Sequence, residues 1–560
     1  MKKILSVCAL SWIALCFGCA LDGHDQPRTV VVQPEDITNI ASTYIDDIVF
    51  DVEGISSSNH IAVISDHCIR IGEAGDYRLS GSHPDSQVIV DAGDDDTVRL
   101  VFDDLQLTSL NSPPILIQNA KKVIIYLMPG TENSLQDSAA SQSEERACLF
   151  SRDDLTITGE GSLEINANLN HGIKANDDLL IWNTTLNIDA TNHAISVHNQ
   201  LGMSGASITL TSGGDGIHVE NDTEPLVSLL HIDSGSLVIT SAQDSLSSSG
   251  EIWITGGTLN LTSGVNSTSA TTSMKGIKAS HTIWLSGGTY VIRSQEDGIH
   301  SNGQITIDGG EYSISAKDDG IHADNQLIIN GGTITISESY EGIESKDIVI
   351  MGGLITIKSS DDGVNATGDH TTTPGQFRPG GMMEQGNGSL LIEGGTLIIN
   401  AYGDGIDVNG SIKMTDGLVL ISGPTSSNNG AIDYDNSFSI TGGTLVACGS
   451  AGMAQNVSSA TNQASILVNL PSSQSVFFRI VDASGENIVT FYPGKSCQSF
   501  LVSSPKLQRN TTYSIYYGGT MTNTVEKIGG LYLDGTYSSG TFYQTVTLNS
   551  SITNLGSVRR

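Results

Sequence analysis

Basic and aromatic residues are scarce in this sequence. Lysine and arginine number 26 against 61 aspartates and glutamates, which gives a formal net charge of −35. This surplus of negative charge disfavours binding to nucleic acid or to an anionic membrane surface, so a polyanionic ligand would need a cation between itself and the protein. Aromatic residues make up only 5 % of the chain, whereas glycine contributes 62 residues. Such a composition is poor for helices and typical of short strands joined by turns.

Cysteine is also scarce, and it is widely spaced. Beyond the N-terminal segment the chain holds Cys68, Cys148, Cys448 and Cys497. These residues lack the short spacings that a cysteine zinc site needs. Separations this wide also predict no particular disulfide pairing.

The N-terminus contains an apolar run, "ILSVCALSWIALCFG", after two lysines. The run is short for a membrane span and typical of a signal peptide. It ends at Gly18-Cys19-Ala20, which resembles a bacterial lipobox, in which the cysteine is lipidated and becomes the first residue of the mature chain. Cys16 and Phe17 depart from the usual Leu and small residue, so ordinary signal cleavage near Ala20 is the alternative. Both interpretations predict an exported protein.

A motif of two acids, Gly, Ile and His occurs at Glu296–His300 and again at Asp318–His322, 22 residues later. The motif glycine, replaced once by alanine, recurs at Gly172, Ala194, Gly216, Gly276, Gly298, Gly320, Gly342, Gly363 and Gly405. Five of these eight intervals are 22 residues, and the last one is 42, which predicts two coils with a loop thrown out. A repeat of this length is typical of a solenoid.

The sequence within one repeat predicts which solenoid forms. The leucine and asparagine skeleton of leucine-rich repeats and the nine-residue calcium β-roll pattern are both missing. A unit such as "IHADNQLIINGGTITISES" instead holds three short alternating stretches separated by turn residues. Three strands and three turns in such a unit make one coil of an all-β fold, the parallel β-helix. Ile299, Ile321, Ile343 and Val364 are then expected to stack inside it, with coils about 4.8 Å apart.

These features divide the chain into four predicted parts. Residues 1–19 form a lipoprotein-type signal peptide, and residues 20–44 form a polar tether. Residues 45–455 form the β-helix, from which the Pro-, Gly- and Met-rich stretch 368–388 leaves as a loop. Residues 456–560 lack the repeat and are richer in Phe and Tyr, which predicts a small C-terminal β-domain or a cap over the last coil.

Five stretches of the sequence, taken together in their order, resemble a known family. They are "VIVDAGDDDTVRLVF", "LFSRDDLTITGEGSLEINANLNHGIKANDDL", "GQITIDGGEYSISAKDDGIHADNQLIINGG", "AGMAQNVSSATNQASILVNL" and "VSSPKLQRNTTYSIYYGG". The family is the bacterial β-helix proteins described as carbohydrate-binding domain-containing, whose folds are similar to family-nine pectate lyases. The resemblance covers nearly the whole mature chain. It implies a right-handed parallel β-helix that binds calcium and holds acidic polysaccharide of the polygalacturonate type, without established catalysis.

Carboxylates occupy equivalent positions in successive repeats. The predicted metal-ligating residues stand one or two places before the motif glycine and are Glu296, Asp297, Asp318, Asp319, Glu341, Asp361, Asp362 and Asp404. Two carboxylates stacked about 5 Å apart repel by roughly 3 kcal/mol at an effective dielectric of about 20. Calcium accepts oxygen ligands and would remove this cost. The alternative is ordinary Asp-Gly turn chemistry, in which Asp bonds its own backbone and Gly supplies a positive φ.

Polar side chains also stand two places after the motif glycine. The predicted ligand-binding residues at this position are His218, Lys278, His300, His322, Glu344 and Asn365. If the intervening isoleucine points inward, this row points outward. Such a row can bind sugar hydroxyls and carboxylates, or it can be a solvated turn edge. A zinc site at His300 and His322 is a weaker interpretation, because the surrounding oxygens favour a harder ion.

Two other functions stay open. A calcium-dependent pectate lyase needs a lysine or arginine base of lowered pKa, and Lys278, Lys317 and Lys346 lie close to the acids in the sequence. Surrounding carboxylates raise a lysine pKa, which counts against these lysines unless calcium neutralises the field. A surface adhesin or spacer would use calcium only to stiffen the rod.

The sequence therefore predicts an exported monomer, either held at the bacterial cell surface by a lipid anchor on Cys19 or secreted. We expect it to bind calcium and, with it, an acidic polysaccharide such as polygalacturonate or pectin. We expect no catalytic residues and no nucleic-acid partner.

Overall fold

The computed structural model of the chain describes residues 43–65, 67–267, 271–367 and 386–556. The predicted signal peptide with its lipidation site Cys19, nearly all of the predicted tether and all but the last three residues of the predicted loop lie outside these ranges. Within the described residues the only helical element is a short 3-10 turn, η1 (Pro225–Val227). No helix in this part of the chain is long and apolar enough to cross a membrane.

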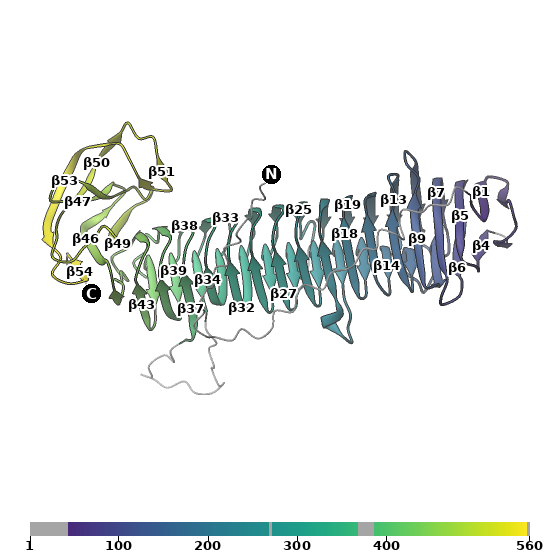
Figure 1. The fold of residues 1–560 in the computed structure, drawn as a ribbon, viewed down its shortest axis with the longest axis horizontal. Coiled ribbons are helices and arrows are strands. Elements are labelled where there is room, and N and C mark those ends of the chain that lie inside the picture. The colour runs from purple at the N-terminus through teal and green to yellow at the C-terminus, as the bar shows by residue number, and fades with distance from the viewer. Residues whose placement is uncertain (1–42, 66, 268–270, 368–385, 557–560) are drawn as a thin grey trace, which may run out of the picture.

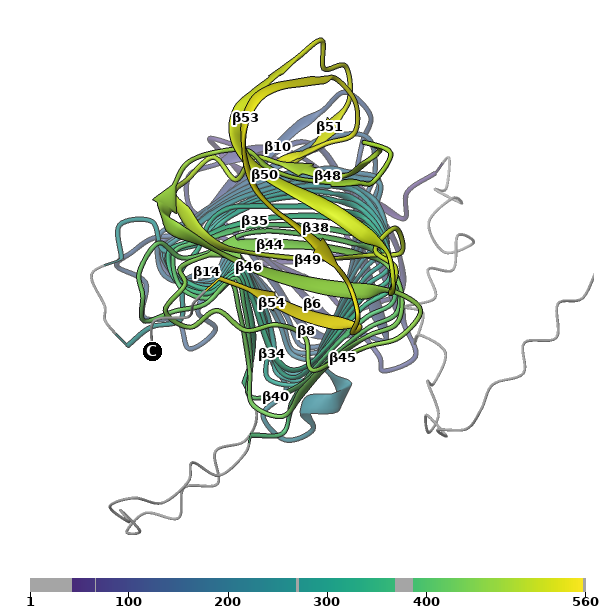
Figure 2. The ribbon, with the colours of Figure 1, turned by 90° about the vertical axis from the view of Figure 1, so that its left-hand side faces the viewer.

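The strands form a parallel β-helix, a rod built from stacked coils (Figure 1), which confirms the predicted fold class. A coil contributes three short strands, and most strands pair in parallel with their counterparts in the neighbouring coils. The stacked coils therefore form three ladders of strands along the rod, and an end-on view shows their outlines superposed (Figure 2).

The first ladder carries the motif isoleucines. Its strands are β4 (Cys68–Ile71), β6 (Gln87–Asp91), β8 (Ile115–Asn119), β11 (Ala147–Ser151), β14 (His171–Ala175), β17 (Ile195–Val197), β20 (Ile217–Val219), β23 (Leu246–Ser248), β26 (Ile277–Ala279), β29 (Ile299–Ser301), the first parts of β32 (Ile321–Ile329) and β34 (Ile343–Ile350), β36 (Val364–Ala366), β39 (Ile406–Val408) and β42 (Ile432–Tyr434).

The other two ladders complete each coil. The second ladder holds β9 (Lys122–Leu127), β12 (Asp154–Thr158), β15 (Leu179–Trp182), β18 (Gln200–Ser204), β21 (Leu229–Ile232), β24 (Glu251–Ile254), β27 (Thr282–Leu285), β30 (Gln304–Ile307), the second parts of β32 and β34, β37 (Gly388–Ile392), β40 (Gly410–Met414), β43 (Ser437–Ile440) and β45 (Ser459–Ala460). The third holds β10 (Glu132–Gln136), β13 (Ser162–Ala167), β16 (Thr185–Ala190), β19 (Ala206–Ser212), β22 (Gly235–Ser241), β25 (Thr258–Thr262), β28 (Thr289–Arg293), β31 (Glu311–Ser315), β33 (Thr333–Glu338), β35 (Leu354–Ser359), β38 (Thr396–Ala401), β41 (Leu418–Ser422) and β44 (Thr444–Gly449).

Irregular strands form the N-terminal end of the rod. They are β1 (Asp46–Asp51), β2 (Gly54–Ser57), β3 (Val63–Ser65), β5 (Gly75–His83) and β7 (Thr97–Thr108). The pairs β1–β2 and β3–β4 are antiparallel, while β1, β5 and β7 pair in parallel. The first coils therefore combine hairpins with the parallel stacking of the rest.

The 22-residue repeat fixes the register of the first ladder. Ile299 pairs with Ile321, and Ile321 pairs with Ile343, as the sequence predicts. Val364, however, pairs directly with Ile406. The 42-residue interval is therefore a single coil lengthened by an insertion between β36 and β37, and the prediction of two coils was wrong.

The interior of the rod is a stack of apolar side chains, and the motif glycines allow the turns to approach one another. Ile299, Ile321 and Ile343 are fully buried, and each such burial contributes about 1.5–3 kcal/mol. A Cβ on Gly320 would lie 2.6 Å from the carbonyl oxygen of Gly342. The motif glycines are therefore required for close packing of one coil on the next.

A C-terminal β-domain closes the end of the rod. The strand β49 (Cys497–Ser504) pairs antiparallel with β44 of the third ladder and with β46 (Ala464–Gln474), and β46 pairs with β54 (Ile552–Leu555). A second, antiparallel sheet contains β47 (Phe478–Asp482), β48 (Asn487–Phe491), β50 (Thr512–Thr522), β51 (Lys527–Ile528), β52 (Leu531–Tyr532) and β53 (Thr536–Thr547). These strands cover the free edge of the last coil, which an open solenoid would expose. The sulfur atoms of Cys448 and Cys497 lie 2.6 Å apart at this junction.

Candidate functional site

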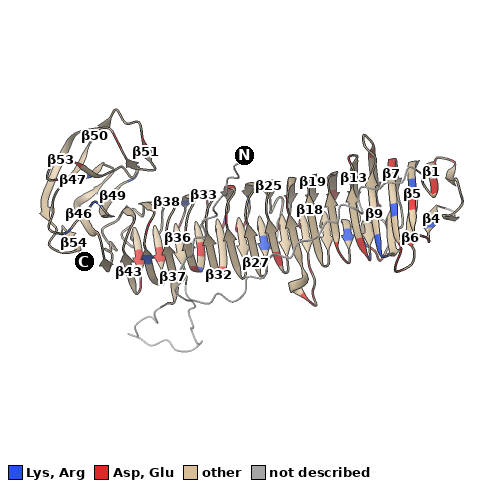
Figure 3. Cartoon of the chain, in the orientation of Figure 1, with Lys and Arg blue, Asp and Glu red and all other residues tan. Residues whose placement is uncertain are grey.

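Two columns of polar residues flank the start of the first ladder. The turn column consists of the residues directly before the motif glycine or its equivalent, namely His171, His193, Asp215, Asp244, Lys275, Asp297, Asp319, Glu341, Asp362 and Asp404. The strand column consists of the residues two places after that position, namely Lys174, Ser196, His218, Ser247, Lys278, His300, His322, Glu344, Asn365, Asp407 and Asp433. Acidic residues recur along the rod, among them segments around β36 and β43 (Figure 3).

The acids of the turn column bond between coils. The Oδ1 atom of Asp297 accepts the backbone N–H of Asp319 at 3.1 Å, and Oδ1 of Asp319 accepts that of Glu341 at 3.2 Å. The motif glycines Gly298 and Gly320 do not have a positive φ. The Asp-Gly pair is therefore not the local turn that was the alternative interpretation of the repeat. It links successive coils through the carboxylate and lets them approach through the glycine.

In the first part of the columns, the second carboxylate oxygen faces a basic side chain. Oδ2 of Asp297 lies 2.8 Å from Nδ1 of His300 and 3.2 Å from Nζ of Lys275. Oδ2 of Asp319 lies 3.1 Å from Nδ1 of His322. The predicted ligands Lys278 and His218 are likewise within 3.6 Å and 2.7 Å of turn-column acids. In these coils a histidine or lysine side chain therefore faces each of these turn-column acids.

These contacts move the pKa values in opposite directions. Burial by itself raises the pKa of Asp297, but hydrogen bonding to His300 and the charge of Lys275 bring it down to about 2. Burial by itself lowers the pKa of His322, but the contact with Asp319 and nearby carboxylates raise it to about 9. At neutral pH the Asp297 carboxylate is therefore ionised and the His322 imidazole is protonated.

The second part of the columns has acids without such partners. Within the described residues Asp362, Asp404 and Asp407 form no ion pair with a basic side chain. Burial, and then the charges of neighbouring acids, raise the pKa of Asp404 and of Asp407 to about 7. For the same reasons the pKa of Glu341 is raised to about 8 and that of Asp362 to about 6. Glu341, Asp362, Asp404, Asp407 and Asp433 therefore form a run of acids without basic partners among the described residues, whereas Oε2 of Glu344 lies 3.4 Å from Nδ1 of His322.

An open pocket of about 360 Å³ lies where the two parts meet. It is lined by Lys275, Asp297, His300, Asp318, Asp319, His322, Tyr340, Glu341 and Glu344. Seven of these nine residues belong to the predicted metal-ligating or ligand-binding sets. The sequence repeat thus brings half of the fourteen predicted site residues into one place, where imidazoles, carboxylates and a phenol ring line an open pocket.

A known protein family matches much of this β-helix. The family model described as "Carbohydrate-binding domain-containing protein" matches residues 65–320 and 302–380, which is more than half of the chain. The chain belongs to this family. The resemblance seen in the sequence is therefore confirmed, and membership supports carbohydrate binding in general.

Two similar proteins accompany the family match. A carbohydrate-binding domain-containing protein of Acetivibrio thermocellus is 34 % identical over 196 residues, which cover 34 % of this chain and 65 % of the relative. The chain thus spans slightly less than two thirds of that relative. A solved structure from C. thermocellum, described as a polysaccharide lyase-like protein in a gadolinium derivative, aligns with 28 % identity, 51 % of this chain, 96 % of that chain and a TM-score of 0.34.

Some of the predicted site residues contact partners that could not be predicted from the sequence of this family member. Glu296 lies apart from the pocket-lining acids and pairs through Oε1 with Nζ of Lys275 at 2.9 Å. Asn365 donates through Nδ2 to Oε2 of Glu341 at 2.6 Å. Asp361 stands beside Asp362 and adds to its raised pKa. These contacts make Glu296 a poor ligand candidate and keep Asp361 in the uncompensated group.

Several residues of the turn column and the strand column were not predicted from the sequence. Lys275 stands directly before Gly276, so alignment on the motif glycine could have found it. His193 stands directly before Ala194, which is already part of the repeat series, so the same alignment could have found it. Asp433 was hidden because Ala431 replaces the motif glycine. The three lysines of the lyase alternative are not among the residues that line the pocket, and Lys317 pairs with the exposed Glu338.

Proposed function

We propose that the chain is an exported protein, anchored by lipid at the bacterial cell surface, that binds acidic polysaccharide of the polygalacturonate type through calcium and does no chemistry on it. The observation that carries this proposal is the run of uncompensated acids from Glu341 to Asp433. Export and anchoring rest on the N-terminal sequence around Cys19. Family membership supports the carbohydrate as ligand.

The donor chemistry of this run fits calcium. Asp362, Asp404 and Asp407 offer only carboxylate oxygens, which are the ligands that calcium prefers. Asp362 raises the pKa of both Asp404 and Asp407, and Asp407 raises that of Asp404, so the apo protein stores repulsion that a divalent cation removes. Such an ion would be held by these three residues and would supply positive charge for a uronate carboxylate of the polymer. A preference for acidic sugars then follows, because a carboxylate is attracted to the bridging cation more strongly than a neutral hydroxyl group is.

Exposed tyrosines at the same edge would supply contact with sugar rings. Tyr340, in the pocket, is 48 % exposed, and Tyr402, two residues before Asp404, is 61 % exposed. An aromatic face packs against the apolar side of a sugar, while the phenol group can hydrogen-bond. The strand column adds the outward side chains of His322 and Glu344. A polymer lying along the rod would meet equivalent groups coil after coil.

The lysine nearest the pocket argues against lyase chemistry. A lyase base must be neutral to take the proton from the sugar, which requires a lowered pKa. Burial alone lowers the pKa of Lys275, but Asp297 and Glu296 reverse this and raise it. The ammonium group is then protonated at neutral pH and acts as a counter-ion. We therefore favour binding over cleavage.

Retention on polygalacturonate tests the proposal. The wild-type chain should be held by the immobilised polymer in calcium and released by a chelator. The variant Asp404→Asn/Asp407→Asn should lose at least about tenfold in affinity, since charge-assisted contacts to a buried ligand are worth more than about 1.4 kcal/mol. The control Asp95→Asn/Asp222→Asn removes the same charge from two exposed acids far from the run and should bind like wild type.

The same experiment separates the other functions. Ultraviolet absorbance of unsaturated product that rises steadily and stops with chelator would replace the binding proposal by a lyase. Calcium binding without retention of any polymer would indicate a stiffened spacer. Retention that is equal with and without chelator, or equal in wild type and the Asp404→Asn/Asp407→Asn variant, would contradict the calcium-bridged model of recognition.

A further inference from the structure

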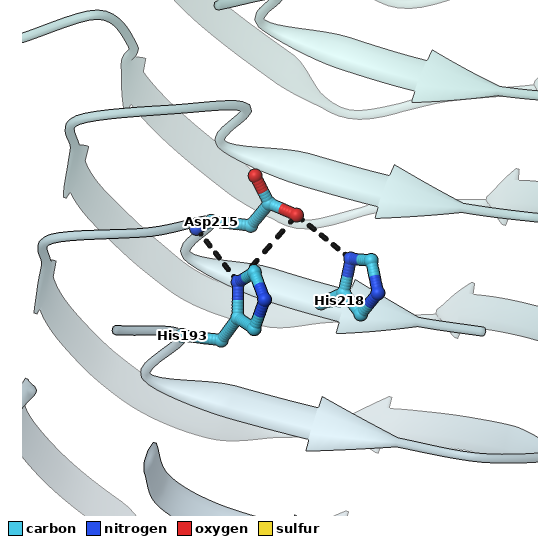
Figure 4. Close-up of side chains that lie close together, drawn as sticks. All are labelled: His193, Asp215 and His218. Carbon is cyan, nitrogen blue, oxygen red and sulfur yellow. Dashed lines mark hydrogen bonds and ion pairs between the residues drawn. The ribbon is translucent and has the colours of Figure 1, made fainter. Parts of the chain in front are cut away.

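A second cluster of metal-ligating side chains lies further toward the N-terminal end of the rod. His193 and Asp215 are neighbours in the turn column, and His218 is the strand-column residue beside Asp215. The imidazole rings of His193 and His218 both lie beside one carboxylate oxygen of Asp215 (Figure 4). Oδ2 of Asp215 lies 2.7 Å from Nδ1 of His218 and 3.6 Å from Nδ1 of His193. One ligand atom of each of the three lies within 4.8 Å of the others.

The donor set differs from that of the acidic run. Two imidazoles and one carboxylate suit zinc and its first-row neighbours, whereas calcium prefers oxygen alone. We propose that His193, Asp215 and His218 form a site for a divalent transition metal ion of the zinc class, distinct from the calcium positions. Three protein ligands leave room for water or a ligand group on the ion.

An outer partner of the kind found at metal sites is already present. Nε2 of His218 lies 2.7 Å from Oε2 of Glu220, on the side of the ring away from Asp215. A ligating histidine commonly donates its other N–H to a carboxylate, which fixes the ring and makes it a better ligand. Glu220 therefore orients His218 with Nδ1 toward Asp215.

A third histidine adds a buried nitrogen next to the cluster. The ring of His171 stacks on that of His193 at 5.2 Å, and the ring of His193 stacks on that of His218 at 4.4 Å. His171 is 8 % exposed, and its Nδ1 has no hydrogen-bond partner among the described residues. A buried imidazole nitrogen without a partner is costly unless something binds it.

Metal binding also has a structural cost at this place. The backbone N–H of Asp215 donates to Nδ1 of His193 at 2.9 Å, so this nitrogen must exchange a hydrogen bond for the ion. The rings of His193 and His218 are nearly parallel, at 7°, so one of them must rotate before both lone pairs meet one ion. We expect a binding site that closes on the metal.

The similar cluster in the pocket is less suited to a metal. Asp297, His300 and His322 also lie within reach of one another. There, however, Nζ of Lys275 lies 3.2 Å from Oδ2 of Asp297 and supplies the positive charge itself. A metal ion would have to displace this ammonium group, which explains why the zinc-class site is assigned to the earlier coils.

Calorimetric titration with zinc chloride tests the assignment, using the exported chain without a histidine tag and with calcium saturating. Wild type should bind zinc at this site, and His193→Gln and His218→Gln should each abolish that binding. Glu220→Gln should weaken it roughly 10- to 100-fold, as outer partners of ligating histidines do. His281→Gln removes an exposed histidine elsewhere and should change nothing. Urea unfolding of each variant shows that the fold is kept.

The outcomes are distinct from those of the polysaccharide experiment. Loss of zinc binding in His193→Gln and His218→Gln, with calcium-dependent polymer retention intact, supports the site. Zinc binding that survives both substitutions, that is lost only in His322→Gln, or that is absent in wild type would overturn it. Failure of retention on polygalacturonate leaves the zinc assignment untouched, because different coils carry the two.

Discussion

Replacing Asp404 and Asp407 by asparagine should reverse an electrostatic penalty that grows with pH. The side chain of asparagine keeps an oxygen, so the contact from Asp404 Oδ1 to the backbone N–H of Gly430 at 2.6 Å can persist. What the substitution removes is negative charge. The folded pKa of each acid is about 7, well above the ordinary value of 3.8.

The sign and size of this effect on the free energy of unfolding follow from the difference between the folded and unfolded pKa values. A carboxyl group whose pKa is raised by folding stabilises the fold below its ordinary pKa, and this stabilisation is lost as pH rises through the folded value. For Asp404 the loss falls between about pH 4 and pH 7. Between pH 5 and pH 7 it amounts to about 2.5 kcal/mol for one group, from about 1.4 kcal/mol per pKa unit. The apo protein should thus be less stable at pH 8 than at pH 5.

Urea unfolding followed by tryptophan fluorescence measures this change in stability with pH, because Trp182, Trp253 and Trp284 all lie in the β-helix. With chelator, the Asp404→Asn/Asp407→Asn variant should be more stable than wild type, and this difference should grow by about 5 kcal/mol between pH 5 and pH 8, about 2.5 kcal/mol from each of the two groups. Other titrating groups are common to both proteins and cancel in the comparison.

Calcium provides the second half of the test. At pH 8 a concentration of about 100 times the dissociation constant should stabilise wild type by about 2.7 kcal/mol, and the variant much less. The reasoning is refuted if wild type and variant show the same dependence on pH, or if calcium stabilises both equally. Either result would mean that these acids are neither repelled nor bridged.

Three further predictions concern the columns and their glycines. Gly320→Ala should destabilise the fold by about 1–3 kcal/mol, because its Cβ would meet the carbonyl of the next coil. Gly72→Ala should be neutral in the same urea assay, because its Cβ would lie at an ordinary contact distance of 3.7 Å from the carbonyl oxygen of Asp91. Asp297→Ala should cost about 3–5 kcal/mol in unfolding free energy, since it removes a buried carboxylate that faces Lys275 and His300 and accepts the backbone N–H of Asp319. Lys317→Ala, which breaks an exposed pair, should cost less than about 1 kcal/mol. The imidazole of His322 should stay protonated up to about pH 9 in a nuclear magnetic resonance titration, and a midpoint near the ordinary 6.5 would contradict its pairing with acids.

Which acids pair with basic side chains could not be predicted from the sequence. The spacing of Asp297 and Asp319 correctly predicted that they lie at equivalent places in adjacent coils. It also led to the expectation that both are metal ligands. In the structure both acids also have basic partners, because His300 and His322 reach back to the turn column of their own coils. Only contacts between side chains could distinguish these acids from Asp404, which has the same place in the repeat.

The sequence by itself determined the β-helix, the register of its coils and the stacking of acids and histidines, because a 22-residue period places equivalent residues above one another whatever their chemistry. The tertiary structure decided which charges are neutralised. Lys275 can face Asp297 only because adjacent coils are in contact, and Asp404 and Asp407 stay uncompensated because no basic residue of the neighbouring described coils pairs with them. Periodicity is a property of the chain, whereas compensation of charge depends on distances between coils that the fold alone sets.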